Sequence, residues 1–116
     1  MHELDITKQL TKKIKQIVKE NDIGKYNLRA IVELGRLSTF SKEPMLHYYN
    51  LIAKEDDVLS KIKLEITIKE GKILCNDCKS EKIIYDFFDK VCDKCNSINT
   101  EIREGRDVFL KKIEKS

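Results

Sequence analysis

Two short stretches decide how the second half of this chain folds: Cys75-Asn76-Asp77-Cys78 and Cys92-Asp93-Lys94-Cys95. Each stretch is a CxxC pair, and the thirteen residues 79–91 separate the two pairs. A CxxC pair forms a tight turn that directs two sulfur atoms to one point, and the intervening segment is long enough to bring the pairs together. The sequence therefore predicts one tetrahedral zinc site whose four thiolate ligands are Cys75, Cys78, Cys92 and Cys95.

Three other interpretations of these cysteines exist: free thiols, two disulfides, or a redox-active CxxC pair. The chain holds four cysteines in all, and all of them belong to the two pairs. Neither pair lies in a thioredoxin-like βαβ pattern, and a reducing compartment favours metal-bound thiolates over disulfides. Because four protein ligands leave no open position for water or substrate, we expect the zinc to be structural.

Length and composition indicate one compact domain with a small appendage. The 116 residues are 41% hydrophobic and 37% charged, with one proline and four glycines. No apolar run approaches the roughly 20 residues that a membrane span needs. The start of the sequence, residues 1–5, lacks the basic and apolar segments of a signal peptide. We therefore expect a cytoplasmic protein that does not enter a membrane.

The charge pattern argues against nucleic acid as the partner. The formal net charge is only +3. The segment 71–99 contains five lysines and five acidic residues, so its side chains sum to zero. A zinc ribbon that binds phosphates should concentrate lysine and arginine instead. A zinc-ribbon nucleic-acid module or a protein-interaction adaptor nevertheless stays open as an alternative function.

Two segments have the periodicity of amphipathic helices. In the first, residues 4–20, the apolar positions fall on one face, and Gly24 is available for a left-handed cap beyond its end. Ser41 and Pro44 favour the start of a second helix, as N-cap and first-turn residue. The second helix is expected to bury Met45, Leu46, Tyr49 and Ile52.

Alternating apolar residues predict the strands. The clearest two alternations are Leu28, Ala30, Val32, Leu34 and Ile62, Leu64, Ile66, Ile68. A last strand or hairpin arm is expected over residues 100–114, interrupted by Gly105. Within the cysteine segment, a short hairpin is expected to support the zinc through Ile83, Tyr85 and Phe87.

These elements predict an α+β fold in which two helices pack on a three-stranded sheet. The four-cysteine lobe would be inserted between the last two strands. We expect one domain formed by residues 1–70 and 100–116, and a zinc-binding domain formed by residues 71–99.

The first three residues form a second candidate metal site. The α-amine of Met1, the backbone nitrogen and Nδ1 of His2, and the backbone nitrogen of Glu3 can surround one ion in a plane. Planar nitrogen donors suit Ni(II) or Cu(II). The α-amine, with a reference pKa of about 7.7–8.0, and the imidazole, about 6.5, must lose protons to bind. Such a site requires that Met1 is retained, and the bulky His2 disfavours its removal.

The remaining polar residues indicate no chemistry of their own. His47 is expected on the surface of the second helix. The lysines of the first helix are expected to form its solvent-exposed face. No cysteine is left for a nucleophile, and neither a glycine-rich phosphate loop nor a histidine with an orienting carboxylate is present. We expect a protein that is not an enzyme.

Several motifs together resemble one family, the HypA/HybF nickel-incorporation proteins that mature [NiFe] hydrogenases and in some cases urease. The resemblance covers essentially the whole chain in order. It rests on Met1-His2-Glu3-Leu4, residues 32–38, Leu64-Glu65-Ile66, the two CxxC pairs and Gly105-Arg106-Asp107.

The resemblance implies a nickel metallochaperone with two metal sites. Met1, His2 and Glu3 match the family's nickel motif, and the four cysteines match its zinc motif. The implied partners are the GTPase HypB and the immature hydrogenase large subunit, with the chain a monomer or weak homodimer. Three positions depart from the family pattern: Asp5 for serine, Ser41 for an aspartate of some members, and Asp107 for glutamate.

Overall fold

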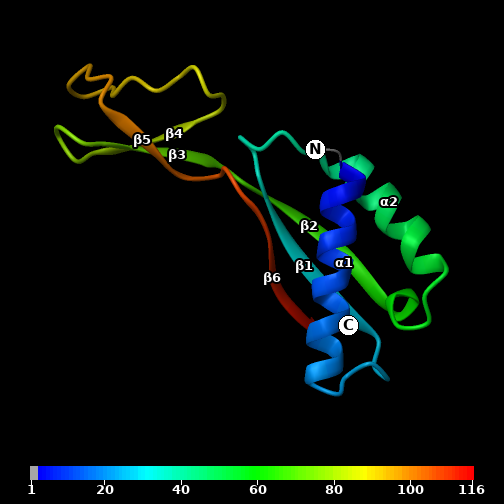
Figure 1. The fold of residues 1–116 in the computed structure, drawn as a ribbon. Helices are drawn as coiled ribbons and strands as arrows, with labels where there is room; N and C mark the ends of the chain where they lie inside the picture. Colours follow the sequence, from blue (N-terminus) through cyan, green and yellow to red (C-terminus); the bar gives the residue numbers. More distant parts are fainter. Residues whose placement is uncertain (1–2) are drawn as a thin grey trace. The chain divides into compact units, whose positions relative to one another are not determined.

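The structure, a computed structural model, describes residues 3–116 and contains two α-helices, one 3-10 helix and six strands in that range (Figure 1). The elements are α1 Glu3–Glu20, β1 Leu28–Gly35, α2 Lys42–Lys54, η1 Leu59–Lys61, β2 Ile62–Lys69, β3 Gly71–Cys75, β4 Glu81–Ile84, β5 Thr100–Glu104 and β6 Val108–Lys115.

The strands form two three-stranded sheets, with orders β2-β1-β6 and β4-β3-β5. The predicted α+β class is confirmed, and the four-cysteine segment lies in the chain between β2 and β6. The predicted last strand is in fact two strands, because Gly105 separates β5 from β6 and each joins a different sheet. Strand β3, which the sequence did not predict, is the centre of the second sheet.

The amphipathic pattern of α1 places one face in the core. Leu10, Ile14 and Val18 are buried on this face, together with two threonines. The hydroxyl of Thr7 donates to the carbonyl of Glu3 at 2.6 Å, so a polar side chain can be buried there without an unpaired group. The lysines of α1 are exposed, as predicted.

The end of α1 differs from the prediction. Asp22, not Gly24, adopts the left-handed conformation, with φ of 53°. Aspartate tolerates this region better than most residues. The backbone N–H of Ile23 then donates to the carbonyl of Val18 at 3.1 Å, which closes the helix end.

The predicted strand faces are largely correct. Leu28, Ala30, Val32 and Leu34 of β1 are all buried. In β2, Ile62, Leu64 and Ile66 are buried, but Ile68, near the end of the strand, is 41% exposed.

Helix α2 buries Met45, Tyr49 and Ala53. Leu46 and Ile52 are only half-buried, while Ala53 takes a buried position that the sequence analysis did not assign. The Tyr49 hydroxyl lies between two carbonyls of the η1–β2 connection, 2.6 Å from that of Ile62 and 3.3 Å from that of Leu59. This contact joins α2 to the start of β2. Burial, with a smaller effect of the Asp56 carboxylate, raises the pKa of Tyr49 to about 12.

We expect Tyr49→Phe to lower the free energy of unfolding by about 1–3 kcal/mol at neutral pH, because a buried carbonyl loses its donor. Unfolded tyrosine ionises near its ordinary pKa of 10.0, whereas folded Tyr49 keeps its proton to about 12. The folded state therefore binds more protons across this window, and wild-type stability falls as pH rises through it.

Urea unfolding at neutral pH and near pH 11 measures both effects. In Tyr49→Phe, the part of the stability loss at alkaline pH that comes from ionisation of Tyr49 should be absent. Tyr48→Phe, on the same helix, should change stability by less than about 0.5 kcal/mol. Equal effects of the two substitutions would contradict the assigned role of the Tyr49 hydroxyl.

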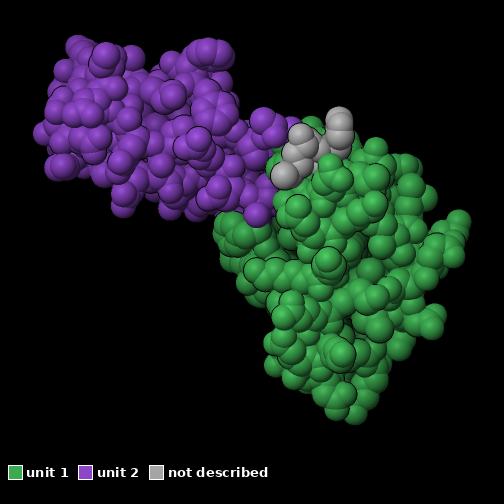
Figure 2. Space-filling model, in the orientation of Figure 1, with its two compact units in different colours: residues 1–32, 40–67, 109–116 green, residues 33–39, 68–108 purple. Residues whose placement is uncertain are grey.

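The chain divides into two compact units (Figure 2). Unit 1 comprises residues 1–32, 40–67 and 109–116, and unit 2 comprises residues 33–39 and 68–108. Unit 2 contains all four cysteines and has its own core of Leu37, Ile73 and Ile84, against which Ile102 packs. Among the described residues, no helix is long and apolar enough to cross a membrane.

Candidate metal centre

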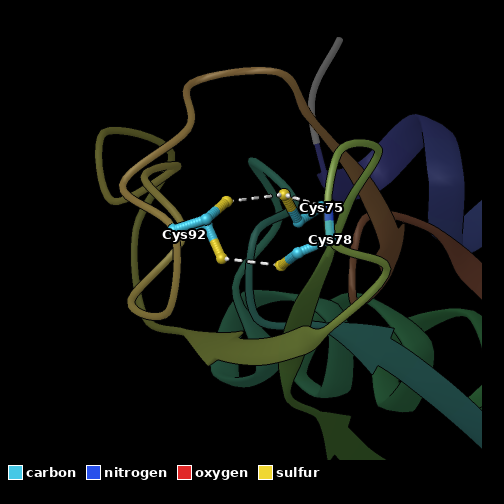
Figure 3. A group of neighbouring side chains, drawn as sticks. Cys75, Cys78 and Cys92 are labelled. Carbon is cyan, nitrogen blue, oxygen red and sulfur yellow. Dashed lines mark hydrogen bonds between the residues drawn. The ribbon is translucent and has the colours of Figure 1, made fainter.

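The four cysteines converge in unit 2. Their sulfur atoms all lie within 4.8 Å of one another. Cys75 is 3.6 Å from Cys95, and Cys78 is 3.5 Å from Cys92, so each close pair joins one CxxC stretch to the other. Figure 3 shows Cys92 on a separate segment of chain from Cys75 and Cys78, with its sulfur directed toward that of Cys78. Within residues 3–116, this is the one group of three or more metal-ligating side chains close enough to share an ion.

Both CxxC turns have the same backbone structure. The carbonyl of Cys75 accepts the N–H of Lys79, and the carbonyl of Cys92 accepts the N–H of Asn96, both at 2.9 Å. Lys79 and Asn96 are both left-handed, with φ of 65° and 59°. In each turn a backbone N–H also points at the first sulfur, from Cys78 at 3.5 Å and from Lys94 at 3.4 Å. Matched turns of this kind present two sulfurs each to a common point.

The site fits a tetrahedral metal ion. With Zn–S bonds of about 2.3 Å, a tetrahedron places its sulfurs about 3.8 Å apart, close to the contacts seen here. Cys75 and Cys92 are buried, whereas Cys78 and Cys95 are exposed. All four positions of the tetrahedron would be filled by protein, which suits a structural ion.

The proton affinities of the thiols also favour a cation. Hydrogen bonds from the Ser80 hydroxyl, and then from backbone N–H groups, lower the pKa of Cys92 to about 6. The pKa of Cys95 is affected in the opposite direction: the backbone N–H of Ser97 lowers it, but contacts with the other thiols and burial together raise it to about 12. Four adjacent thiolates repel one another, and a divalent cation removes that repulsion.

Polar side chains around the sulfurs were not found from the sequence. The Ser80 hydroxyl lies 2.9 Å from the sulfur of Cys78 and 3.4 Å from that of Cys92. The carboxylate of Asp77 accepts hydrogen bonds from Ser97 and Asn99, which ties the first turn to the segment after the second. These contacts support the cysteine geometry from outside it.

The hairpin next to the site is present, but its predicted buried side is wrong. Ile83, Tyr85 and Phe87 are exposed, by 51%, 69% and 37% respectively, and Ile84 is fully buried. Ile84 lies opposite Gly71 in the β3–β4 pair and belongs to the core of unit 2. The loop after the hairpin is held instead by Lys82, whose Nζ lies 2.7 Å from Asp89 and 3.0 Å from Asp93.

The second predicted site is only partly within the described residues. Met1 and His2 lie outside them. Glu3 begins α1, and its carboxylate accepts the backbone N–H of Ser41 at 3.0 Å. Ser41 is the N-cap residue of α2, as predicted, although its own hydroxyl makes no capping bond. His47 is exposed on α2, and Asp5 is exposed on α1.

The comparisons with known proteins bear on the whole chain. Residues 1–115 match the family model described as "Hydrogenase/urease nickel incorporation, metallochaperone, hypA". The chain belongs to the HypA family. The family description is that of a metallochaperone for nickel incorporation.

Relatives named "Hydrogenase maturation factor HypA" match over nearly their full lengths. The Aquifex aeolicus protein is 34% identical over 116 residues, which cover 98% of this chain and 96% of the relative. The Moorella thermoacetica protein is 33% identical over 110 residues, or 95% of each chain.

Two solved HypA structures have the same fold. The Ni metallochaperone HypA from Helicobacter pylori aligns with a TM-score of 0.70 at 24% identity, over 99% of this chain and 97% of that one. A second HypA solution structure aligns with a TM-score of 0.75, also at 24% identity, over 100% and 97% of the two chains.

Proposed function

We propose that this protein carries Ni(II) at its N-terminus and delivers it during maturation of a [NiFe] hydrogenase or a urease. The match of residues 1–115 to a nickel-incorporation family carries the proposal. In this proposal the protein binds two metals at separate places. Zinc in the four-cysteine site holds unit 2 together, and nickel is cargo that must be bound and released.

The two donor sets suit these different roles. Four sulfur ligands from the protein leave a metal no open position, so exchange with a partner is disfavoured there. The N-terminal donors are the α-amine of Met1, the backbone nitrogen and imidazole of His2, and the backbone nitrogen of Glu3. They are a planar nitrogen set of the kind that Ni(II) accepts.

The contact of Glu3 with Ser41 is consistent with separate roles for the backbone and the side chain of Glu3 in this proposal. The carboxylate is engaged with the backbone N–H of Ser41, 38 positions further along the chain. In the proposed site the backbone nitrogen of Glu3 is a metal donor, and the carboxylate holds the start of α1 to the start of α2. Glu3→Gln, which keeps an acceptor oxygen, should therefore disturb nickel binding less than Glu3→Ala.

The recipients follow from the family resemblance. We propose that nickel passes through the GTPase HypB to the immature hydrogenase large subunit.

The test is nickel titration of untagged protein by calorimetry, with zinc content measured in parallel. The wild type should bind about one Ni(II) per chain, and affinity should rise between about pH 6 and pH 8 as the imidazole and α-amine lose protons. His2→Ala should abolish this binding without changing the zinc content. A two-residue extension before Met1 should do the same, because it removes the free amine from its place.

His47→Ala is the matched control, since it removes the other histidine from an exposed helical position. It should bind nickel as the wild type does. Unchanged nickel affinity and stoichiometry in His2→Ala would overturn the proposal.

A further inference from the structure

Four lysines form a single row along α1: Lys8, Lys12, Lys15 and Lys19. Their spacing of four, three and four residues places them on one side of the helix. The row is about 17 Å long, at 1.5 Å per residue. All four side chains belong to exposed residues of unit 1. The row borders the buried face of α1 on the side toward η1, since Lys15 pairs with Asp56 just before η1.

Two hollows open beside this row. One, of about 650 Å³, is lined by Lys12, Lys15 and Lys19 together with Val18 and Val58. The other, of about 400 Å³, is lined by Lys8, Lys12 and Lys15 together with Ile52 and Leu59. Since both hollows share Lys12 and Lys15, they adjoin, and together they form a groove along α1. We call this surface the α1 groove.

The floor of the α1 groove is apolar. Its accessible apolar side chains are Val58 and Ile52, which are half-buried, while Val18 and Leu59, 2% and 1% exposed, close the groove beneath them. The aliphatic stems of the lysines add further apolar surface along the wall. An apolar floor below a charged rim is the usual composition of a groove that binds an amphipathic helix.

The charge on the rim is only partly neutralised. Lys15 donates to the carboxylate of Asp56 at 2.6 Å. Lys8, Lys12 and Lys19 have no ion pair with any residue from 3 to 116. The nearby Glu20 carboxylate accepts instead from the amide of Gln16, at 2.9 Å. Three cations therefore line one edge without an ion-pair partner among the described residues, although the net charge of the whole chain is only +3.

We propose that the α1 groove is a docking surface for an acidic amphipathic helix of a partner protein. Apolar side chains of that helix would cover the floor, and its flanking carboxylates would meet the lysine row. Nucleic acid fits less well, because a phosphate backbone offers the floor no apolar groups. In addition, Asp22 and Asp56 line the two hollows and would repel a uniform polyanion.

A synthetic peptide tests this surface directly. The probe is a labelled helix of about 15 residues with leucines on one face and glutamates along both edges, followed by fluorescence anisotropy. The wild type should bind it, and binding should weaken as salt is raised, because the lysines lie at an exposed rim. The same peptide with serine in place of leucine should bind at least about tenfold more weakly, since it buries no apolar side chains against the floor of the groove.

Charge-reversal variants distinguish binding in the α1 groove from non-specific electrostatic attraction to the whole protein. Lys12→Glu/Lys19→Glu should weaken binding by at least about tenfold. The control pair, Lys13→Glu/Lys63→Glu, makes the same change in net charge at exposed positions outside the groove and should change affinity by less than about threefold. Lys12→Gln/Lys19→Gln gives a second, milder variant, and circular dichroism checks that each variant keeps its helices.

Equal weakening by the two charge-reversed pairs would overturn the proposal, because net charge alone would then explain binding. Equal affinity for the leucine and serine peptides would also overturn it. So would a duplex DNA of similar length that binds the groove more tightly than the peptide and displaces it.

Discussion

Cys92→Ala is expected to abolish zinc binding and to unfold unit 2 while the helices of unit 1 remain. Cys92 is buried, and its sulfur contacts that of Cys78 at 3.5 Å across the two CxxC turns. Structural zinc contributes about 10–16 kcal/mol of apparent binding free energy, and in a small unit that energy is folding energy. Outside the site, the core cluster of unit 2 consists of Leu37, Ile73 and Ile84, which is too small to replace the metal.

Zinc analysis and amide hydrogen exchange measure the two effects. The wild type should contain about one zinc per chain, and Cys92→Ala close to none. Amides of β3 and β5 should lose their protection in the variant, and those of α1 should keep theirs. Retention of zinc together with protection in β3 would contradict the structural role of the site.

Ser80→Ala is the matched control for the cysteine substitution. It removes the hydroxyl that contacts the sulfurs of Cys78 and Cys92 but leaves all four sulfurs. Loss of such an outer partner typically lowers metal affinity by about 10–100-fold. Even with zinc affinity lowered by this factor, zinc should stay bound at full stoichiometry, and unit 2 should remain folded.

Long periodic elements were predictable because a buried face repeats along them. Helix α1 and strand β1 each show several buried residues at the expected spacing. Strand β3 has five residues and β4 only four, which is too few for a period to appear. The buried side of β4 is set by Leu37 and Ile73, which lie at distant positions in the chain. Local alternation therefore predicted the wrong side.

In the metal centre, too, local features could be predicted from the sequence and features set by distant contacts could not. The spacing of the cysteines predicted that they converge, because a CxxC turn is a local structure. The left-handed backbone of Lys79 carried no signal, since lysine does not favour this conformation, whereas Asn96 is of a residue type that adopts it more readily. Ser80 touches the sulfurs only because β4 begins immediately after the first turn. The bond between Glu3 and Ser41 joins positions 38 apart and depends on the packing of α1 against α2.

Gly105→Ala is expected to destabilise unit 2 by about 3–5 kcal/mol. Gly105 has φ of +86°. A Cβ at this position would lie 2.5 Å from the carbonyl oxygen of Glu70 and 2.6 Å from the Cα of Gly71. Both are backbone atoms, which cannot move aside as the end of a side chain can.

The crowding has a structural origin. The backbone segments 35–37, 69–71 and 105–107 come together here within unit 2. Leu37 donates to the carbonyl of Gly105 at 2.8 Å, Gly35 to that of Asp107 at 2.8 Å, and Arg36 to that of Lys69 at 2.9 Å. Displacing the segment at Gly105 would strain these bonds together, so the cost should exceed that of an ordinary left-handed glycine.

Two further variants distinguish steric overlap of the added Cβ from the requirement for a left-handed backbone at position 105. Urea unfolding of each protein measures the loss of free energy of unfolding. Gly24→Ala is the control, since its Cβ would meet only the Val18 side chain, at 3.4 Å, and it should change stability by less than about 1 kcal/mol. Gly105→Asn keeps a residue that tolerates positive φ but still introduces a Cβ. If overlap dominates, Gly105→Asn will be as unstable as Gly105→Ala. Recovery of most of the stability by asparagine would instead show that the backbone conformation alone requires glycine.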